Sequence, residues 1–165
     1  MPAGRLHVRI DNRLLHGQVV QFWIPYLEVE HLLIADDLAA SNTAMAAVYR
    51  MAVPRRIRLS VVSMVELLGA VKESNALPSL IIMGDVFDFA RAYMNGFRCA
   101  QITLGNIHSA PGRIRVTDTV YLTPEELEAL SRFSDADIRV QIQTFPGESL
   151  NLIKGKDGGH EWLRP

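Results

Sequence analysis

The sequence contains very little cysteine, and this scarcity excludes several kinds of site. Cys99 is the single cysteine among 165 residues. One cysteine can form neither an intrachain disulfide nor a Cys-x-x-Cys redox pair, and it cannot build a cysteine-based zinc or iron–sulfur site. We therefore expect Cys99 to pack in the interior, and we expect the protein to fit a reducing setting such as the cytoplasm.

An excess of charge of one sign and a long apolar run are also missing. The 17 Lys and Arg residues nearly balance the 18 Asp and Glu residues, so no global field attracts a nucleic acid or an anionic membrane. No segment approaches the roughly 18 apolar residues of a membrane-spanning helix, and charged residues interrupt the N-terminal segment where a signal peptide would lie. We expect a soluble cytoplasmic protein without a nucleic-acid partner.

Regular alternation of apolar runs and helical segments predicts the fold class. Short β-branched runs predict strands at 6–10, 31–35, 57–62, 80–83, 100–104 and 138–144. Helical spacing predicts helices at 17–27, 42–51, 64–74, 86–95 and 124–133. This order is typical of an α/β protein with a single domain, a mostly parallel central sheet and helices on both faces.

Helix start and stop signals support these boundaries. Ser63 with Glu66, and Thr123 with Glu126, have the spacing of capping boxes. Asp85 is a candidate N-cap for the helix at 86–95, with Gly96 suited to the left-handed position that ends it.

The first helix has its own pattern. Its apolar side chains are predicted to share one face, and Pro25 should limit or kink the helix because proline lacks an amide donor. The residues of this face are Val19, Phe22, Trp23, Tyr26 and Leu27.

The chain shows no linker that would divide it into two domains. We expect the folded domain to span residues 1–154 and residues 155–165, rich in glycine and charge, to form a flexible tail. Docking of Trp162 onto the domain is the alternative.

The segment from Arg9 to Val19 carries the candidate chemistry. It follows the first predicted strand, and ligands of open parallel sheets bind beyond the carboxyl ends of strands. His16 directly precedes a helix, whose first amides favour an anion. A phosphoryl group on this histidine would find a guanidinium in Arg13, close backbone approach at Gly17 and an amide donor in Gln18.

Acidic residues have two interpretations each. Asp11 is placed to orient an imidazole or to hold Arg9, whose charge is otherwise uncomfortable on an apolar strand. Asp36 ends the second strand, where it either lines the same crevice or caps a helix. Local physics alone also leaves His16 and Arg13 open as ordinary surface residues.

The same run resembles a known motif. Arg9-Ile-Asp-Asn-Arg-Leu-Leu-His-Gly-Gln-Val19 is similar to RIDDRLIHGQV, the active-site pattern of the IIB component of the mannose/fructose/sorbose family of the bacterial sugar phosphotransferase system (PTS). The similarity extends over about residues 5–154 and includes Trp23, Ala35-Asp36-Asp37, Val53-Pro54 and the stretch 102–120 with Asn106-Ile107.

The resemblance implies a cytoplasmic phosphocarrier. His16 would accept a phosphoryl group from the phosphohistidine of a IIA partner and pass it to a sugar bound by the membrane IIC/IID complex, during phosphoenolpyruvate-dependent sugar uptake. Arg13 would bind phosphate, and Asp11 and Asn12 would shape the loop. Because phosphoryl transfer between nucleophiles relies on positioning and charge stabilisation, we expect no metal or other cofactor. A homodimer is compatible with the resemblance.

Two departures from the family pattern concern the loop around the site. Asn12 stands where the common motif has Asp, which removes one negative charge near the phosphoryl group. His108-Ser109 replaces the usual Gly-Gly pair after Asn106-Ile107. His108 is therefore either a supporting site residue that adds a donor or changes the fit of the partner, or an exposed loop histidine.

Two other functions compete with sugar transport. A regulatory phosphocarrier, whose phosphorylation state is sensed by another protein, would have the same domain and the same histidine. A nucleotide-binding domain is the generic alternative for βαβ units, but no GxGxxG or GxxxxGK[ST] motif follows a strand.

Overall fold

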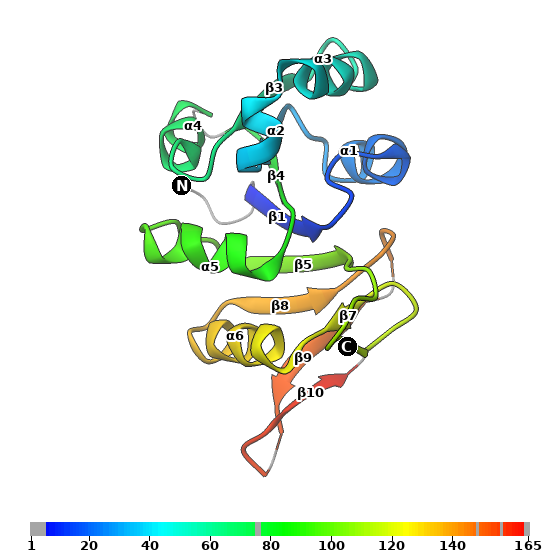
Figure 1. Cartoon of the computed structure of the whole chain (residues 1–165), viewed down its shortest axis with the longest axis vertical. Helices are drawn as coiled ribbons and strands as arrows, with labels where there is room; N and C mark the ends of the chain where they lie inside the picture. The colour runs from blue at the N-terminus through cyan, green and yellow to red at the C-terminus, as the bar shows by residue number, and fades with distance from the viewer. Residues whose placement is uncertain (1–5, 75–76, 148, 156, 164–165) are drawn as a thin grey trace.

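The computed structural model describes residues 6–74, 77–147, 149–155 and 157–163. Its centre is an eight-stranded sheet in the order β10-β9-β8-β5-β1-β4-β2-β3 (Figure 1). The strands in chain order are β1 (Leu6–Asp11), β2 (His31–Ala35), β3 (Arg58–Val62), β4 (Ser79–Met83), β5 (Gln101–Asn106), β8 (Arg139–Ile142), β9 (Leu150–Lys154) and β10 (His160–Leu163). A separate two-stranded sheet pairs β6 (Ile114–Arg115) with β7 (Tyr121–Leu122).

Six neighbouring strands of the large sheet run parallel; at one edge β9 pairs antiparallel with β8, and β10 pairs antiparallel with β9. The central strands β2 and β4 are buried along their whole length, as expected for parallel strands covered on two faces. The predicted α/β class with a mostly parallel sheet is confirmed.

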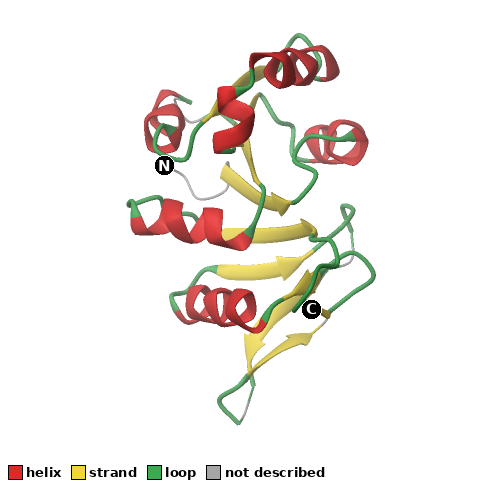
Figure 2. Ribbon diagram, in the orientation of Figure 1, coloured by secondary structure: helices red, strands yellow, loops and turns green. Residues whose placement is uncertain are grey.

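Helices cover both faces of the sheet (Figures 1 and 2). One apolar core packs beneath α4 (Leu67–Glu73), α5 (Val86–Met94) and α6 (Pro124–Asp135). The opposite core packs beneath a π-helical turn, η1 (Val19–Trp23), and α1 (Ile24–Tyr26), α2 (Asp37–Ser41) and α3 (Thr43–Ala52). The chain therefore leaves β1 over one face and β5 over the other. A crevice forms between such neighbouring strands at their carboxyl ends.

Most of the predicted helix ends are present. Thr123 and Glu126 form a complete capping box, Asp85 Oδ1 accepts a hydrogen bond from the Asp88 amide, and Gly96 adopts a φ of 98°. The Ser63 capping box is present only in part: Glu66 Oε2 accepts from the Ser63 amide at 2.9 Å, but the Ser63 hydroxyl donates to the same carboxylate at 2.6 Å, and α4 begins only at Leu67, without a side-chain cap.

The first predicted helix differs from expectation in the way it turns. Pro25 has no amide to donate to Gln21, and the Ile24 amide bonds to Val19, five residues back, which is the π-helical pattern. The predicted apolar face is only partly buried: Val19 and Trp23 pack in the core, whereas Phe22 and Tyr26 are 46% and 60% exposed.

The C-terminal segment also differs from the predicted flexible tail. His160–Leu163 forms β10, which pairs antiparallel with β9, and Trp162 packs against the core. Residues 155, 157, 158 and 159 connect the two strands, so the glycine-rich stretch belongs to a hairpin. Residues 156, 164 and 165 lie outside the described part of the chain.

Candidate functional site

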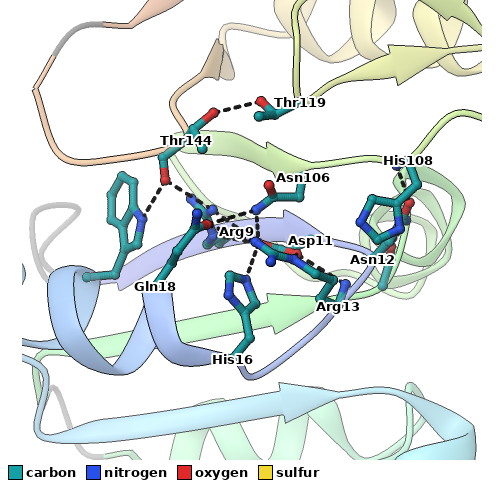
Figure 3. Close-up of polar contacts among 12 residues, drawn as sticks. Arg9, Asp11, Asn12, Arg13, His16, Gln18, Asn106, His108, Thr119 and Thr144 are labelled. Carbon is teal, nitrogen blue, oxygen red and sulfur yellow. Dashed lines mark hydrogen bonds and ion pairs between the residues drawn. The ribbon is translucent and has the colours of Figure 1, made fainter.

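The buried carboxylate of Asp11 is the centre of a polar cluster at the end of β1 (Figure 3). Asp11 Oδ2 accepts hydrogen bonds from Arg9 Nη2 at 3.1 Å, His16 Nε2 at 2.8 Å and Asn106 Nδ2 at 2.8 Å. Asp11 Oδ1 accepts from the backbone amide of Arg13 at 3.1 Å. One acidic side chain therefore fixes the strand, the following loop and the end of the neighbouring strand β5.

The position of this cluster follows from the topology. Asp11 and Asn106 are cross-strand partners at the carboxyl ends of β1 and β5, just after a register shift between these strands. This point is the switch where the chain leaves the sheet over opposite faces, which is the usual ligand crevice of open α/β sheets.

Arg9 is buried, with 1% exposure, and its guanidinium is held on several sides. Besides Asp11, its Nη1 donates to the carbonyl of Gln143 at 3.0 Å and its Nη2 to the carbonyl of Thr144 at 3.4 Å. The guanidinium lies 4.8 Å from the ring centroid of Trp23, whose Nε1 also donates to the Thr144 carbonyl, at 3.1 Å. A carboxylate, two carbonyls and an aromatic face thus compensate the buried charge.

Gly105 is required by the same guanidinium. A Cβ atom at this position would overlap the side chain of Arg9. Any larger residue at 105 would therefore displace Arg9 from Asp11.

The lowered pKa of the Asp11 carboxyl favours its ionised form. Burial raises the pKa of the Asp11 carboxyl, but the hydrogen bond from His16, the charge of Arg9 and the bond from Asn106 outweigh burial and hold the pKa below its ordinary value. Burial lowers the pKa of Arg9 and Asp11 offsets part of this effect. Arginine stays protonated in proteins, so Asp11 and Arg9 form an ion pair.

His16 presents one ring nitrogen to Asp11 and keeps the other for chemistry. An ionised carboxylate only accepts hydrogen bonds, so Nε2 carries the proton and Nδ1 carries the lone pair of the neutral imidazole. The side chain is 13% exposed. The loop that carries it is anchored by the buried Leu14 and Leu15, with Leu14 in the left-handed region at a φ of 53°.

Arg13 and Gln18 lie next to the histidine. Arg13 Nη2 donates to Gln18 Oε1 at 2.8 Å, and Asn106 Nδ2 lies 3.3 Å from the same oxygen. The Arg13 side chain is 38% exposed and its Nε is 3.9 Å from Asp11 Oδ1. The structure thus brings Arg13, Gln18 and His16 together around Asp11, with the guanidinium at the surface.

Asn12 organises a second loop beside the first. Its Nδ2 donates to the Gly84 carbonyl at 2.6 Å, and its Oδ1 accepts from the backbone amide of His108 at 2.8 Å. Arg113 Nη1 donates to the His108 carbonyl at 2.8 Å while its Nη2 pairs with the buried Glu126 at 2.7 Å. An amide at position 12 can donate and accept at once, which a carboxylate could not do.

The remaining candidates are peripheral to this cluster. His108 is exposed and contributes its backbone to Asn12. Asp36 caps α2, accepting from the Ala39 amide at 2.7 Å. A Cβ at Gly17 would meet nothing within 4 Å, so the fold itself does not require glycine there.

Sequence reasoning missed the groups that come from distant strands. Asn106 was recognised only as part of the family resemblance, although it bonds both Asp11 and Gln18. Its place at the end of a strand was the available signal. The carbonyls of Gln143 and Thr144 leave no signal in the sequence, because every residue has a carbonyl.

Other kinds of site are not built from the described residues. Among them, no group of three or more His, Cys, Asp or Glu side chains could hold a metal ion. Within the same ranges, no helix has the length and apolar character needed to cross a membrane. Cys99 is partly buried, and burial raises the pKa of its thiol to about 11.

Comparisons with known proteins point in one direction. Residues 5–154 match the family described as the PTS system sorbose subfamily IIB component. The sorbose-specific EIIB component of Klebsiella pneumoniae is 21% identical over 148 residues, which cover 88% of this chain and 90% of that protein. The N-acetylgalactosamine-specific phosphotransferase enzyme IIB component 2 of Escherichia coli (strain K12) is 24% identical over 148 residues, 88% of this chain and 94% of that protein. The mannose-specific EIIAB component of the same strain matches 82% of this chain with 20% identity, over 42% of its own length.

Solved structures share the fold. The IIBSor domain of the sorbose permease from Klebsiella pneumoniae superimposes with a TM-score of 0.81 and 20% identity, covering 89% of this chain and 93% of that one. A PTS-dependent N-acetyl-galactosamine IIB component from Streptococcus pyogenes gives a TM-score of 0.80 and 21% identity, with 98% and 96% covered.

Proposed function

Because the chain belongs to the sorbose subfamily of PTS IIB components, we propose that it carries a phosphoryl group on Nδ1 of His16. The observation that supports this most strongly is the bond between His16 Nε2 and Asp11 Oδ2 at 2.8 Å. It fixes the tautomer and turns the lone pair of Nδ1 away from the carboxylate.

The transfer step balances without an added base. The Nδ1 lone pair attacks the phosphorus of a donor phosphohistidine whose other ring nitrogen is protonated. The new P–N bond forms, and the donor's P–N bond breaks with its electron pair returning to the donor ring, which leaves as a neutral imidazole. His16 keeps its proton on Nε2 throughout. The ring becomes more cationic as the bond forms, and the ionised Asp11 stabilises that charge.

The negative charge on the phosphoryl oxygens requires hydrogen-bond donors on the solvent-facing side of His16. The exposed guanidinium of Arg13 has a planar fork suited to two oxygens. The backbone amides of Gly17 and Gln18 lie in the first turn of the helix, where amides have no intrahelical acceptor. In this proposal Gln18 Oε1 accepts from Arg13 and orients its guanidinium, while the backbone amide of Gln18 donates to the phosphate.

The partners follow from the same assignment. We propose that a phosphorylated IIA protein is the donor, which is in keeping with a relative whose name, EIIAB, joins the two components. The acceptor would be a sugar bound by the membrane IIC/IID complex, and the chain would work in the cytoplasm, alone or as a homodimer. The charge that holds the anion is local, in agreement with the balanced composition.

Localisation of the phosphate tests the proposal. After incubation with phosphoenolpyruvate and the upstream PTS proteins, mass spectrometry should find one phosphate, on His16, and NMR of the labelled ring should place it on Nδ1. Phosphate on another residue, or on Nε2, would contradict the proposal. Adding membranes that contain IIC/IID and a sugar should remove the label; a label that persists with every sugar would favour the regulatory alternative.

A further inference from the structure

The rim of the phosphoryl site has two chemically different sides. On one side lie the 38% exposed guanidinium of Arg13 and the exposed loop that carries His108. On the other side two phenylalanines meet edge to face, Phe22 and Phe145, with ring centroids 5.3 Å apart. They are 46% and 45% exposed. An apolar pair of this size beside a polar cluster calls for an explanation other than core packing.

The topology places both phenylalanines toward the edge of the sheet where His16 lies. Phe145 follows β8, which is parallel to β5 and hence ends at the same edge of the sheet as β1. Phe22 belongs to η1, in the helix that begins directly after His16. In Figure 3, Thr144 and Gln18 both lie on the side of Arg9 that faces away from His108.

The two segments that carry the pair are joined by hydrogen bonds of the neighbouring residues. Trp23, next to Phe22, donates its Nε1 hydrogen to the carbonyl of Thr144, next to Phe145. Arg9 donates to the same carbonyl. These hydrogen bonds join the loop after β8 to the segment that contains β1 and the helix after it. The joined segments keep the two rings in contact with each other, and aromatic side chains are typical anchors of protein interfaces.

We propose that Phe22 and Phe145 form the apolar docking contact for the histidine-phosphorylated donor protein, opposite the guanidinium of Arg13. This inference rests on the function proposed above. The partner that fits is a protein face with a phosphohistidine at its centre: the anionic phosphoryl group meets Arg13, and apolar side chains beside the phosphohistidine cover the phenylalanine pair. Charge complementarity sets the orientation, and the aromatic pair supplies a small anchor typical of a transient complex.

The test separates docking from chemistry by using two phosphoryl donors. Phe22→Ser, Phe145→Ser and the double variant are compared with the wild type, with the phosphorylated IIA protein as one donor and phosphoramidate, which needs no docking surface, as the other. We expect kcat/KM with the protein donor to fall about tenfold for each single change and further for the double variant, mainly through KM. The rate with phosphoramidate should change less than about twofold.

Met94→Ser is the matched control. Met94 is 84% exposed at the C-terminal end of α5, and a helix that follows a strand of a parallel sheet ends near the opposite edge. Its replacement should leave both rates unchanged. Phe22→Leu and Phe145→Leu should restore part of the loss, because a leucine still offers an apolar contact.

Three results would overturn the inference. If the serine variants take phosphate from the protein donor as fast as the wild type, the pair is not a docking contact, and the role of His16 is unaffected. If both donors slow equally, the pair supports the geometry of the site and not the docking. If the wild type takes phosphate from neither donor, the proposed function itself fails, and the docking inference with it.

Discussion

His16 and His31 lie at opposite ends of the parallel strands and have opposite surroundings. His31 begins β2 and is fully buried, with Nδ1 3.0 Å from Ser74 Oγ and Nε2 2.8 Å from Ser60 Oγ. Burial, with a smaller effect of Arg58, lowers the pKa of His31 to about 4. His16 lies beyond the carboxyl end of β1, keeps some exposure and bonds through Nε2 to a carboxylate.

The comparison shows that the partner, and not the residue type, decides what a histidine can do. Serine hydroxyls at both nitrogens of His31 satisfy a neutral ring and leave no lone pair for a nucleophile. A carboxylate at one nitrogen of His16 fixes the other as the nucleophile and stabilises positive charge on the ring. Placement at the carboxyl edge adds the access that a buried strand start lacks.

Replacing each of the two histidines by alanine should give the largest difference between them in phosphate labelling and in stability. His16→Ala should abolish uptake of acid-labile, base-stable phosphate from a phosphorylated IIA donor, while the free energy of unfolding changes little. His31→Ala should retain labelling, yet lose on the order of 2 kcal/mol of stability, because the buried ring and its hydrogen bonds to Ser74 and Ser60 are lost. Radiolabelling and urea unfolding measure the two effects. Equal labelling of His16→Ala and wild type would remove His16 from the mechanism.

Asp11→Asn changes the partner and keeps the ring. An asparagine can accept the Nε2 hydrogen bond but supplies no negative charge, so we expect phosphoryl transfer to His16 to slow on the order of 10²-fold. The same change leaves Arg9 buried without its counterion, and stability should fall by about 3 kcal/mol.

An exposed carboxylate provides the control for Asp11. Asp37 is 52% exposed and pairs with Arg91 at 3.2 Å. Asp37→Asn should therefore change stability by less than about 1 kcal/mol and leave transfer at the wild-type rate. If Asp11→Asn transferred phosphate as fast as Asp37→Asn, electrostatic support of the ring by Asp11 would be wrong.

The parallel part of the fold was predictable from the sequence because its strands are continuous apolar runs. The runs at 31–35 and 80–83 coincide with β2 and β4 within one residue. The C-terminal hairpin was not predicted, because glycine and charge at its turn resemble a tail. The π-helical turn was also missed, since its cause is the missing amide of Pro25 combined with the packing of Val19 and Trp23.

The site was predictable where it is contiguous in sequence. Arg9, Asp11, Arg13, His16 and Gln18 lie in one run, and the structure brings them together. The residues that complete it come from β5 and from the segment after β8, and their register is set by the folded sheet. The sequence predicts either a crevice or a capping role for Asp36, and the structure shows the cap.

The pH dependence of stability gives the smallest expected effect, and it arises from the lowered pKa of His31. Unfolded His31 titrates near 6.5, whereas the folded pKa is about 4. Between pH 4 and pH 6.5 the unfolded chain binds more protons than the folded chain. The stabilisation that comes from the His31 pKa difference is therefore fully present above pH 6.5, and it is lost as the pH drops toward 4, by at most about 3 kcal/mol. Burial also lowers the pKa of His7, which adds a slope of the same sign.

His31→Gln isolates the contribution of the ring. Glutamine does not titrate, and it can still bond one serine hydroxyl, so the variant should be less stable than the wild type near neutral pH and should approach it as the pH falls. Urea unfolding at several values between pH 4 and pH 7 measures both curves. Parallel curves would mean that His31 binds its proton equally well in the folded and unfolded chains, and the contrast with His16 would then lie in access alone.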